Sequence, residues 1–469
     1  MSTDFFRLML PELSLILIIF VLLIFKISDL FKQNSSLIII TNTLFLLNIG
    51  AILFSFHNGT LFNGMYITKH LFVFEKLILN IGTLIIFMLS FEWLKNHKHL
   101  SEFYLLIISS LLGMEYMISS GNFLMFYLGL ELASIPLSAL VNFDLEKKKS
   151  SEAAMKMILL SAFASGIMLF GISIIYGTTG SLNFDILKSG IQANQLNIIA
   201  LIFIFSGFAF KISAVPFHLW TADVYEGAPI SVTAFLSVIS KAVIVFVFIT
   251  VLSKLFYNLQ FLWYNLLITI VALTVTIANL FAIRQQNIKR FLAFSSIAQA
   301  GYILLSIISN NNFGYASAVY FVIVYLFSNL GVFGIVSAIS DKYGKEEIND
   351  YKGFYKNNTL LSWALAISIF SLAGIPPAAG FFGKMFLITS GANTGNFLLI
   401  GIVVFNMVIS LYYYLNLIKK VFVDTNDSPI KTIKIGINQK TAILVCFVGT
   451  IIIGFVGVLF DYISTLFNI

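Results

Sequence analysis

The sequence predicts an all-α polytopic membrane protein of about fourteen transmembrane helices. Of its 469 residues 59% are hydrophobic and 10% are charged, and the mean hydropathy is +0.96. Soluble domains contain about 25% charged residues, so the composition lies outside the soluble range. Apolar runs of roughly 20 residues recur along the chain, and each can cross a bilayer as a helix that satisfies its own backbone hydrogen bonds.

These runs give the predicted helices in order. The first apolar run follows no basic leader and has no small-residue cleavage site, so we expect this run to be a retained helix rather than a signal peptide. The fourteen runs begin near Leu10, Leu37, Leu71, Phe103, Phe123, Met155, Leu196, Ser231, Trp263, Phe291, Tyr315, Leu361, Phe397 and Ala442.

The basic residues predict an orientation. Most of the 28 Lys and Arg residues fall in loops on one side, such as the run at positions 147–149. The positive-inside rule places this side inward and therefore both termini outside. The net charge of +7 thus reflects membrane topology, and we expect no nucleic-acid partner. The few basic residues on the opposite side are Arg7, Lys69, Lys188 and Lys254.

Cofactor and metal chemistry has no readable motif here. The single cysteine, Cys446, excludes an internal disulfide and a cysteine-ligated iron–sulfur cluster or zinc site. The five histidines are scattered, and no nucleotide-binding glycine pattern is present. We therefore expect no cofactor and no metal bound by this chain.

Several ionisable residues lie deep in the apolar runs. Lys241 has mostly apolar residues on both sides over at least two turns, and Glu131 is similarly central in "YLGLELASIPLSAL". A charge at this depth costs at least ~2.5–3.5 kcal/mol, so a functional role is the default interpretation. Glu115 is also central, but its role stays open. For Lys156, and for the adjacent Glu75 and Lys76, a position near the membrane surface is favoured, where long side chains reach water.

Two further lysines lie in segments that proline and glycine should break. Lys211 precedes Pro216, and Lys384 follows Pro376 and Pro377. Broken helices at membrane depth are tolerated where they line a polar cavity, and a corresponding pair indicates internal repeats and an ion pathway. The two segments are the seventh and twelfth spans, and this odd offset predicts five-helix units of opposite orientation.

Five ordered motifs carry a family resemblance over nearly the whole chain. The chain resembles the subunit N family of respiratory complex I, the proton-pumping NADH:quinone oxidoreductase. The motifs are "YLGLELASIPLSAL", "FAFKISAVPFHLWTADVYEGAP", "SVISKA", "NIKRFLAFSSIAQAGYILL" and "LAGIPPAAGFFGKMF".

The resemblance implies an antiporter-like fold with inverted repeats formed by spans four to eight and nine to thirteen. We expect four parts: residues 1–100, the repeats 101–257 and 258–422, and a loop with a last helix, 423–469. NADH, FMN, the iron–sulfur clusters and quinone are then expected in other subunits. Subunit M on one side and the small subunit K on the other are the implied neighbours, in a bacterial inner membrane.

The resemblance also assigns roles to single residues. Glu131 matches the acid of the fifth helix and Lys211 the lysine of the seventh that pairs with it. Lys241 matches the central lysine of the eighth helix, and Lys384 the lysine of the broken twelfth.

Two positions depart from the family pattern. Gln299 stands where a histidine is usual, so a relay here must use water or hydroxyls such as that of Ser296. Glu115 has no counterpart in the pattern, which leaves open a second acid on the Glu131 side.

A charge switch explains why an acid lies in the fifth run. Burial weakens the hold of a lysine on its proton, and a nearby carboxylate restores it. At ~6 Å and an effective dielectric of ~20 such a pair is worth roughly 2.8 kcal/mol. Opening and closing a pair of Glu131 with Lys211 would release and retain a proton. A subunit of a multisubunit cation/proton antiporter, and a purely structural membrane spacer, remain the alternatives.

Overall fold

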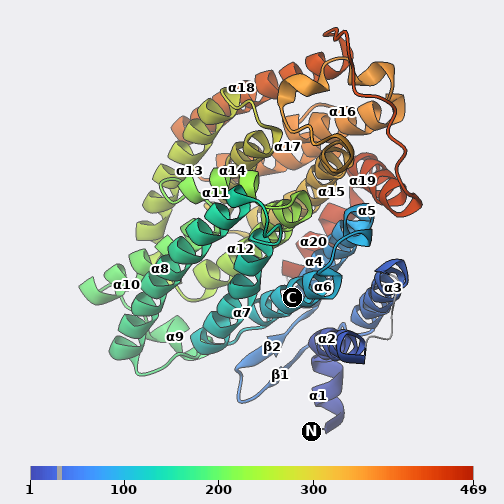
Figure 1. The fold of residues 1–469 in the computed structure, drawn as a ribbon. Helices are drawn as coiled ribbons and strands as arrows, with labels where there is room; N and C mark the ends of the chain where they lie inside the picture. The colour runs from blue at the N-terminus through green and yellow to red at the C-terminus, as the bar shows by residue number, and fades with distance from the viewer. Residues whose placement is uncertain (1, 29–33, 468–469) are drawn as a thin grey trace. The chain divides into compact units, whose positions relative to one another are not determined.

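The structure, a computed structural model, describes residues 2–28 and 34–467, and these are largely helical (Figure 1). Within them, thirteen helices are long and apolar enough to cross a membrane. The predicted twelfth span is present as two shorter helices, and this accounts for the difference from fourteen. The fold class predicted from the sequence is therefore confirmed.

The chain forms two compact units. Unit 1 comprises the residues up to Phe87, Phe91–Lys211 and Ile239–Trp263, and unit 2 comprises Met88–Ser90, Ile212–Val238 and the residues from Tyr264 onward. Unit 1 contains α1 (Ser2–Leu8), α2 (Leu10–Ser28), α3 (Asn34–Leu53), β1 (Gly59–Leu61), β2 (Tyr66–Thr68), α4 (His70–Leu89, except its end), α5 (Phe91–Lys95), α6 (Leu100–Ile118), α7 (Phe123–Val141), α8 (Lys148–Thr179), α9 (Phe184–Gly190), α10 (Gln195–Ile212, except its last residue), η1 (Tyr257–Leu259) and the first turn of α13 (Gln260–Ile283).

Unit 2 holds the later helices, and α12 (Ile230–Lys254) passes through both units. Its elements are α11 (Leu219–Gly227), α13 (Gln260–Ile283), α14 (Ile288–Ile307), α15 (Asn312–Tyr343), η2 (Ile348–Tyr351), η3 (Phe354–Lys356), α16 (Thr359–Ala373), α17 (Ala379–Ala392), α18 (Phe397–Phe422), α19 (Ile437–Phe455) and α20 (Val458–Phe467).

A short β-hairpin precedes α4, which the sequence did not predict. Strands β1 and β2 pair antiparallel, with Leu61 opposite Tyr66. The connecting turn holds Phe62, Asn63 and Gly64 at positive φ, a conformation that glycine and asparagine adopt at low cost. The hairpin places Tyr66 over the start of α2, where the side chain is fully buried.

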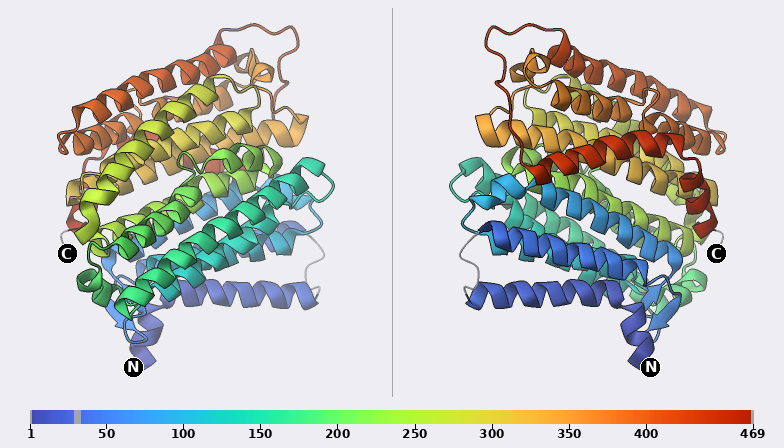
Figure 2. Two further views of the ribbon diagram at one scale, coloured as in Figure 1. Left: turned by 90° about the vertical axis from the view of Figure 1, so that its left-hand side faces the viewer. Right: turned by 90° about the vertical axis from the view of Figure 1, so that its right-hand side faces the viewer.

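In unit 1, glycines allow α6 and α7 to pack side by side (Figure 2). A Cβ on Gly113 would lie 2.5 Å from the backbone nitrogen of Ala133, and one on Gly129 would lie 2.8 Å from the carbonyl oxygen of Gly113. Small residues that bring backbones together are the usual means of helix association in membranes. The Ser110 hydroxyl adds a hydrogen bond of 2.8 Å to the Ala133 carbonyl oxygen.

Both predicted helix breaks are present. The helix α10 ends at Ile212, and α11 begins at Leu219 beyond Pro216. The helix α16 ends at Ala373, and α17 begins at Ala379 beyond Pro376 and Pro377. Proline lacks the backbone N–H that would continue either helix.

The helices that precede the two breaks share several features. The helices α8 and α15 each have 32 residues, and each ends at a glycine in the left-handed region, Gly180 and Gly344. An asparagine caps the preceding helix in both cases, and each of these asparagines forms an isolated bridge with a residue that follows the long helix. The bridged pairs are Asn122 with Asn183, and Asn287 with Glu347. The exact limits of the four predicted parts stay a prediction.

Candidate functional site

Lys211 lies in the last turn of α10, where three helices of unit 1 converge. Its ammonium donates a hydrogen bond of 2.6 Å to the Ser134 hydroxyl of α7 and one of 2.8 Å to the Ser161 hydroxyl of α8. The lysine side chain is half-buried, and both serines are buried. The sequence did not predict either serine as a site residue, since hydroxyls at helical spacing are common in apolar helices.

Glu131 lies one turn before Ser134 on α7, so the helix brings the predicted acid to the same site. Its charge acts on Lys211, and Tyr127, one turn earlier, also interacts with the carboxylate. Its Oε1 atom is buried and has no hydrogen-bond partner among the described residues. The two predicted partners therefore share a site, while the ammonium bonds directly to the serines.

The segment after Lys211 is not helical, but part of its backbone is still hydrogen-bonded. Ser213 has a positive φ of 65°, as is common just after a helix end. The backbone N–H of Val215 donates a hydrogen bond of 3.0 Å to the Thr274 hydroxyl of α13. The break is thus a defined connection between α10 and α11.

Lys384 lies in α17, and it reaches back across the second break. Its ammonium donates a hydrogen bond of 3.1 Å to the carbonyl oxygen of Ala373, the last residue of α16. It also lies 5.2 Å from the centre of the Tyr302 ring. The last carbonyls of a helix lack intrahelical donors and carry partial negative charge, so this is a favourable place for a cation.

The two breaks differ in the order of lysine and proline along the sequence, but their lysines occupy similar places in the structure. Lys211 precedes its proline in the sequence, whereas Lys384 follows its prolines. In the structure, Lys211 lies in the last turn of the first half-helix, and the ammonium of Lys384 bonds to the end of the first half-helix. Each break therefore associates a lysine with the carboxyl end of its first half.

Lys241 lies near the middle of α12, as predicted. Its side chain is 5% exposed, and 89% of the most apolar part of this helix is buried. A long side chain cannot reach water easily from this position. Lys241 is thus buried within unit 1, on the helix that continues into unit 2.

Gln299 lies in α14, a helix of unit 2. Its amide nitrogen donates hydrogen bonds to the Leu372 carbonyl oxygen at 3.1 Å and to the Tyr414 hydroxyl at 3.2 Å. The Tyr414 hydroxyl in turn lies 2.5 Å from that of Ser295. The amide oxygen of Gln299 is buried, and the described residues supply no partner for it. The sequence did not predict Tyr414, which comes from α18, more than a hundred residues away.

Ser296 belongs to a second group of hydroxyls in unit 2. Tyr225 and Tyr325 both interact with it, and the Tyr325 hydroxyl lies 2.9 Å from that of Ser237. The Asn329 amide donates to Tyr325 at 2.6 Å and to Ser237 at 2.8 Å. Serine, tyrosine and amide side chains thus line the interior of unit 2 around Ser296.

The helices α7 and α14 can be compared position by position from the asparagines that cap them. Counted from the capping asparagines Asn122 and Asn287, Glu131 occupies the position of Ser296. By the same count, Ser134 occupies the position of Gln299. The first helix therefore carries an acid where the second carries a hydroxyl.

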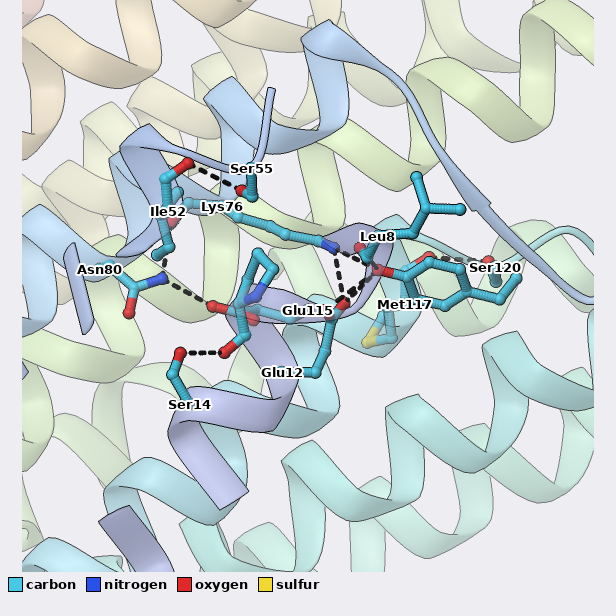
Figure 3. A network of polar contacts seen from close by, with 12 residues as sticks. Leu8, Glu12, Ser14, Ile52, Ser55, Lys76, Asn80, Glu115, Met117 and Ser120 are labelled. Atoms are coloured by element: carbon cyan, nitrogen blue, oxygen red, sulfur yellow. Dashed lines mark hydrogen bonds and ion pairs between the residues drawn. The ribbon is translucent and has the colours of Figure 1, made fainter. Parts of the chain in front are cut away.

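Glu115 lies in a cluster that α2, α4, α6 and β2 form (Figure 3). The Lys76 ammonium lies 2.5 Å from Glu12 Oε1, and both side chains are fully buried. Asn80 donates a hydrogen bond of 2.6 Å to Glu115 Oε1. Tyr66 completes the group, which we call the Lys76 cluster (Glu12, Tyr66, Lys76, Asn80 and Glu115).

The Lys76 cluster corrects one expectation from the sequence. The expectation that the long side chain of Lys76 reaches water is wrong, because Lys76 and Glu75 are both buried. Glu115 Oε1 accepts a hydrogen bond from Asn80, and its role as a second acid on the Glu131 side stays a prediction. Lys156 does have a partly exposed side chain, which pairs with Glu152 at 2.7 Å.

Metal ligation was not predicted, and within residues 2–28 and 34–467 no three His, Cys, Asp or Glu side chains are grouped to hold a metal ion.

Comparison with protein families and curated relatives gives consistent matches. A family model described as "NADH:quinone oxidoreductase/Mrp antiporter, TM" matches residues 120–410. The NADH-quinone oxidoreductase subunit N of Phocaeicola vulgatus is 47% identical over 410 residues, which cover 86% of this chain and 87% of that protein. The subunit of the same name from Azobacteroides pseudotrichonymphae is 45% identical over 87% of this chain and 86% of its own.

Solved structures resemble the whole chain. A chain of respiratory complex I from Thermus thermophilus with bound aureothin superposes with a TM-score of 0.81 at 27% identity, covering 95% of this chain and 96% of that one. A chain of the Mrp complex from Dietzia sp. DQ12-45-1b gives a TM-score of 0.87 at 18% identity, over 98% and 96% of the two chains. At that identity the second match shows the fold alone.

Proposed function

The chain belongs to the NADH-quinone oxidoreductase subunit N family of antiporter-like membrane subunits, and we propose that its buried lysines carry protons across the membrane. It is a subunit of an oxidoreductase that also acts as a proton translocase. The observation that carries the proposal is the position of Lys211, bonded to two hydroxyls beside the carboxylate of Glu131.

The ammonium of Lys211 can bond to the serine hydroxyls or move toward the carboxylate of Glu131. In the arrangement seen, Ser134 and Ser161 accept hydrogen bonds from Lys211 without balancing its charge. Movement of the ammonium toward Glu131 would strengthen the Coulomb attraction between the two groups, which is roughly 2.8 kcal/mol at ~6 Å and a dielectric of ~20. A term of this size decides whether the lysine keeps or releases its proton, so the movement can drive a transfer step.

From Lys211 the proposed route continues to Lys241 and then to Lys384. Lys241 is buried on α12, which contributes residues to both units. In unit 2 the hydroxyls around Ser296 and the amide of Gln299 offer groups through which a proton can pass with water. We propose a relay role for Glu115 as well.

The setting of the subunit follows from the family and the charge pattern. We propose subunit M and the small subunit K as neighbours, with NADH, FMN, iron–sulfur clusters and quinone in other subunits. We further propose a bacterial inner membrane, with both termini on its outer side. The basic loops support this orientation, because lysine and arginine concentrate on the inner side of membrane proteins.

A subunit of a multisubunit cation/proton antiporter is the second candidate, and the fold shared with the Mrp complex favours it. Purification of the tagged chain in mild detergent separates the two candidates. Flavin- and iron–sulfur-containing subunits should co-purify with the chain. Recovery of an assembly without them would favour the antiporter.

Lys241→Met tests the relay directly. The substitution keeps length and apolar character but removes the proton carrier, so NADH-driven proton pumping should fall at least about tenfold, a barrier change of about 1.4 kcal/mol. Lys254→Met, at the end of the same helix, is the matched control and should pump normally. Normal pumping by Lys241→Met, with the complex assembled, would reject the relay.

A further inference from the structure

The Lys76 cluster contains more charge than a structural ion pair requires. Glu12 and Lys76 already form a complete pair, and neither side chain is exposed to solvent. Glu115 adds a second fully buried acid, and its charge also acts on Lys76. When both acids are ionised, the cluster holds a net negative charge away from water, which costs free energy.

A chain of amides ends on Glu115. Ser14 donates to Asn48, the Asn48 amide donates to Asn80 at 2.8 Å, and the Asn80 amide donates to Glu115 Oε1 at 2.6 Å. The Asn48 and Asn80 amides thus both donate in the direction of Glu115 Oε1, and Figure 3 shows the Asn80 bond. The second oxygen, Oε2, is buried, and no described residue bonds to it. One oxygen is thus fixed, and the other is open to a proton.

The cluster lies at one end of its helices. Glu12 is in the first turn of α2, and Glu115 is in the last turn of α6. Tyr66 covers this end, since its hydroxyl lies 3.0 and 3.1 Å from the two oxygens of Glu12 and 2.9 Å from the Leu8 carbonyl oxygen. Burial raises the pKa of Tyr66, so its hydroxyl remains protonated and can act as a donor.

A cavity adjoins the same end. It has a volume of about 760 Å³, and its lining includes Arg7, Leu8, His57 and Gly59. Leu8 both lines this cavity and accepts the hydrogen bond from Tyr66. Leu8 and Tyr66 therefore connect the cavity lining to Glu12 of the cluster.

We propose that Glu115 binds and releases a proton at the outer side of the membrane, so that the Lys76 cluster is a proton-release site distinct from the Lys211 site. This proposal rests on the proposed function and on the outward orientation of the N-terminus. Binding forms an O–H bond at Glu115 Oε2 and removes one negative charge. Release breaks that bond, passes the proton to water in the cavity, and restores a carboxylate that Lys76 can balance.

Lys76 links the two acids in this step. It is bonded to Glu12 in the arrangement seen, and its ring contact with Tyr66 holds the ammonium 5.3 Å from the ring centre. When Glu115 is ionised, the lysine is attracted to both carboxylates, and when Glu115 is protonated, only to Glu12. The position of one lysine thus follows the protonation of Glu115.

The test compares Glu115→Gln, Glu115→Asp and Glu102→Gln in the assembled complex in sealed vesicles. Glutamine keeps the shape and the hydrogen bond from Asn80 but cannot bind a proton, so the initial rate of NADH-driven proton pumping should fall at least fivefold. Aspartate keeps a carboxyl group and should retain more than half of the rate. Glu102, on the same helix and paired with Lys26 at the surface, is the control and should pump normally when changed.

Two results would overturn the proposal. The first is normal pumping by Glu115→Gln. The second is an equal loss of assembled complex in the Gln and Asp variants, since a purely structural role predicts it. Lys241→Met, measured in parallel, separates this question from the proposed function. If Lys241→Met is inactive while Glu115→Gln is normal, only the release site fails, whereas normal pumping by both rejects the relay itself.

Discussion

The ammonium of Lys211 lies 2.6 Å from the hydroxyl oxygen of Ser134, one helical turn beyond Glu131 on the same helix. The lysine therefore has a neutral partner and a charged partner within reach of one flexible side chain. A site of this kind can hold a proton carrier in two positions of similar free energy. The free-energy difference between them depends on the hydroxyl as much as on the acid.

We expect Ser134→Ala to slow proton pumping several-fold in fully assembled complex. A hydrogen bond to a charged group is worth about 1.5–3 kcal/mol, so its loss shifts the lysine toward the other position. Ser134→Thr keeps the hydroxyl and should remain near wild type. Ser138→Ala, one turn further along, removes a hydroxyl that donates to the backbone carbonyl oxygen of Ser134 and serves as the control. Equal rates for both alanine variants would show that the Ser134 hydroxyl has no part in the step.

We expect Lys384→Met to abolish pumping and to lower the thermal stability of the complex. The Ala373 carbonyl oxygen would lose its donor, and an unsatisfied buried acceptor costs about 1–3 kcal/mol. Lys356→Met, at an exposed position, should change neither property. Proton flux and thermal unfolding, measured on the same preparations, separate the two effects. A variant that is inactive but as stable as wild type would mean that the bond to Ala373 contributes no stability.

We expect Gln299→His to pump near the wild-type rate and Gln299→Leu to pump more slowly. An imidazole has an unperturbed pKa near ~6.5 and can serve as a donor toward Tyr414. Leucine removes both hydrogen bonds of the amide and leaves an apolar surface, which tends to stay dry. The measurement is proton flux per NADH oxidised in sealed vesicles. Full activity of the leucine variant would place the proton route away from residue 299.

We expect Gly113→Ala to destabilise the packing of α6 on α7. The new methyl group would lie 2.5 Å from the backbone nitrogen of Ala133, and overpacking of this kind costs about 1–3 kcal/mol. Gly166→Ala, where nothing lies within 4 Å, is the control and should be neutral or slightly stabilising. The midpoint of thermal unfolding in detergent reports the difference. Identical midpoints would mean that α6 and α7 separate at no cost.

Long apolar runs were enough to predict the helices, because a membrane span depends mainly on local composition. The two breaks were equally predictable, since Pro216 and Pro376 remove backbone donors wherever they stand. The short hairpin β1–β2 was not predicted, because three-residue strands leave no recognisable alternation.

Burial depth was harder to predict than helix position. The burial of Lys241 was predicted because its own run places it centrally. Lys76 was misjudged, because the partner that stabilises it, Glu12, belongs to a helix 64 residues away. The serines that hold Lys211 carried no signal of their own, and only the packing of α7 and α8 identifies them.

The length of α8 and α15 has a consequence for the lipid around them. At about 1.5 Å per residue, 32 residues span about 48 Å, well beyond the ~30 Å of the hydrocarbon layer. Each helix must tilt or extend its polar end, at Lys148 in α8 and Lys342 in α15, into the headgroup layer. A broken helix follows each of these long helices in the chain. Bilayer thickness therefore acts on the segments that hold Lys211 and Lys384, and membranes of different lipid chain length should tune the activity of the same sequence.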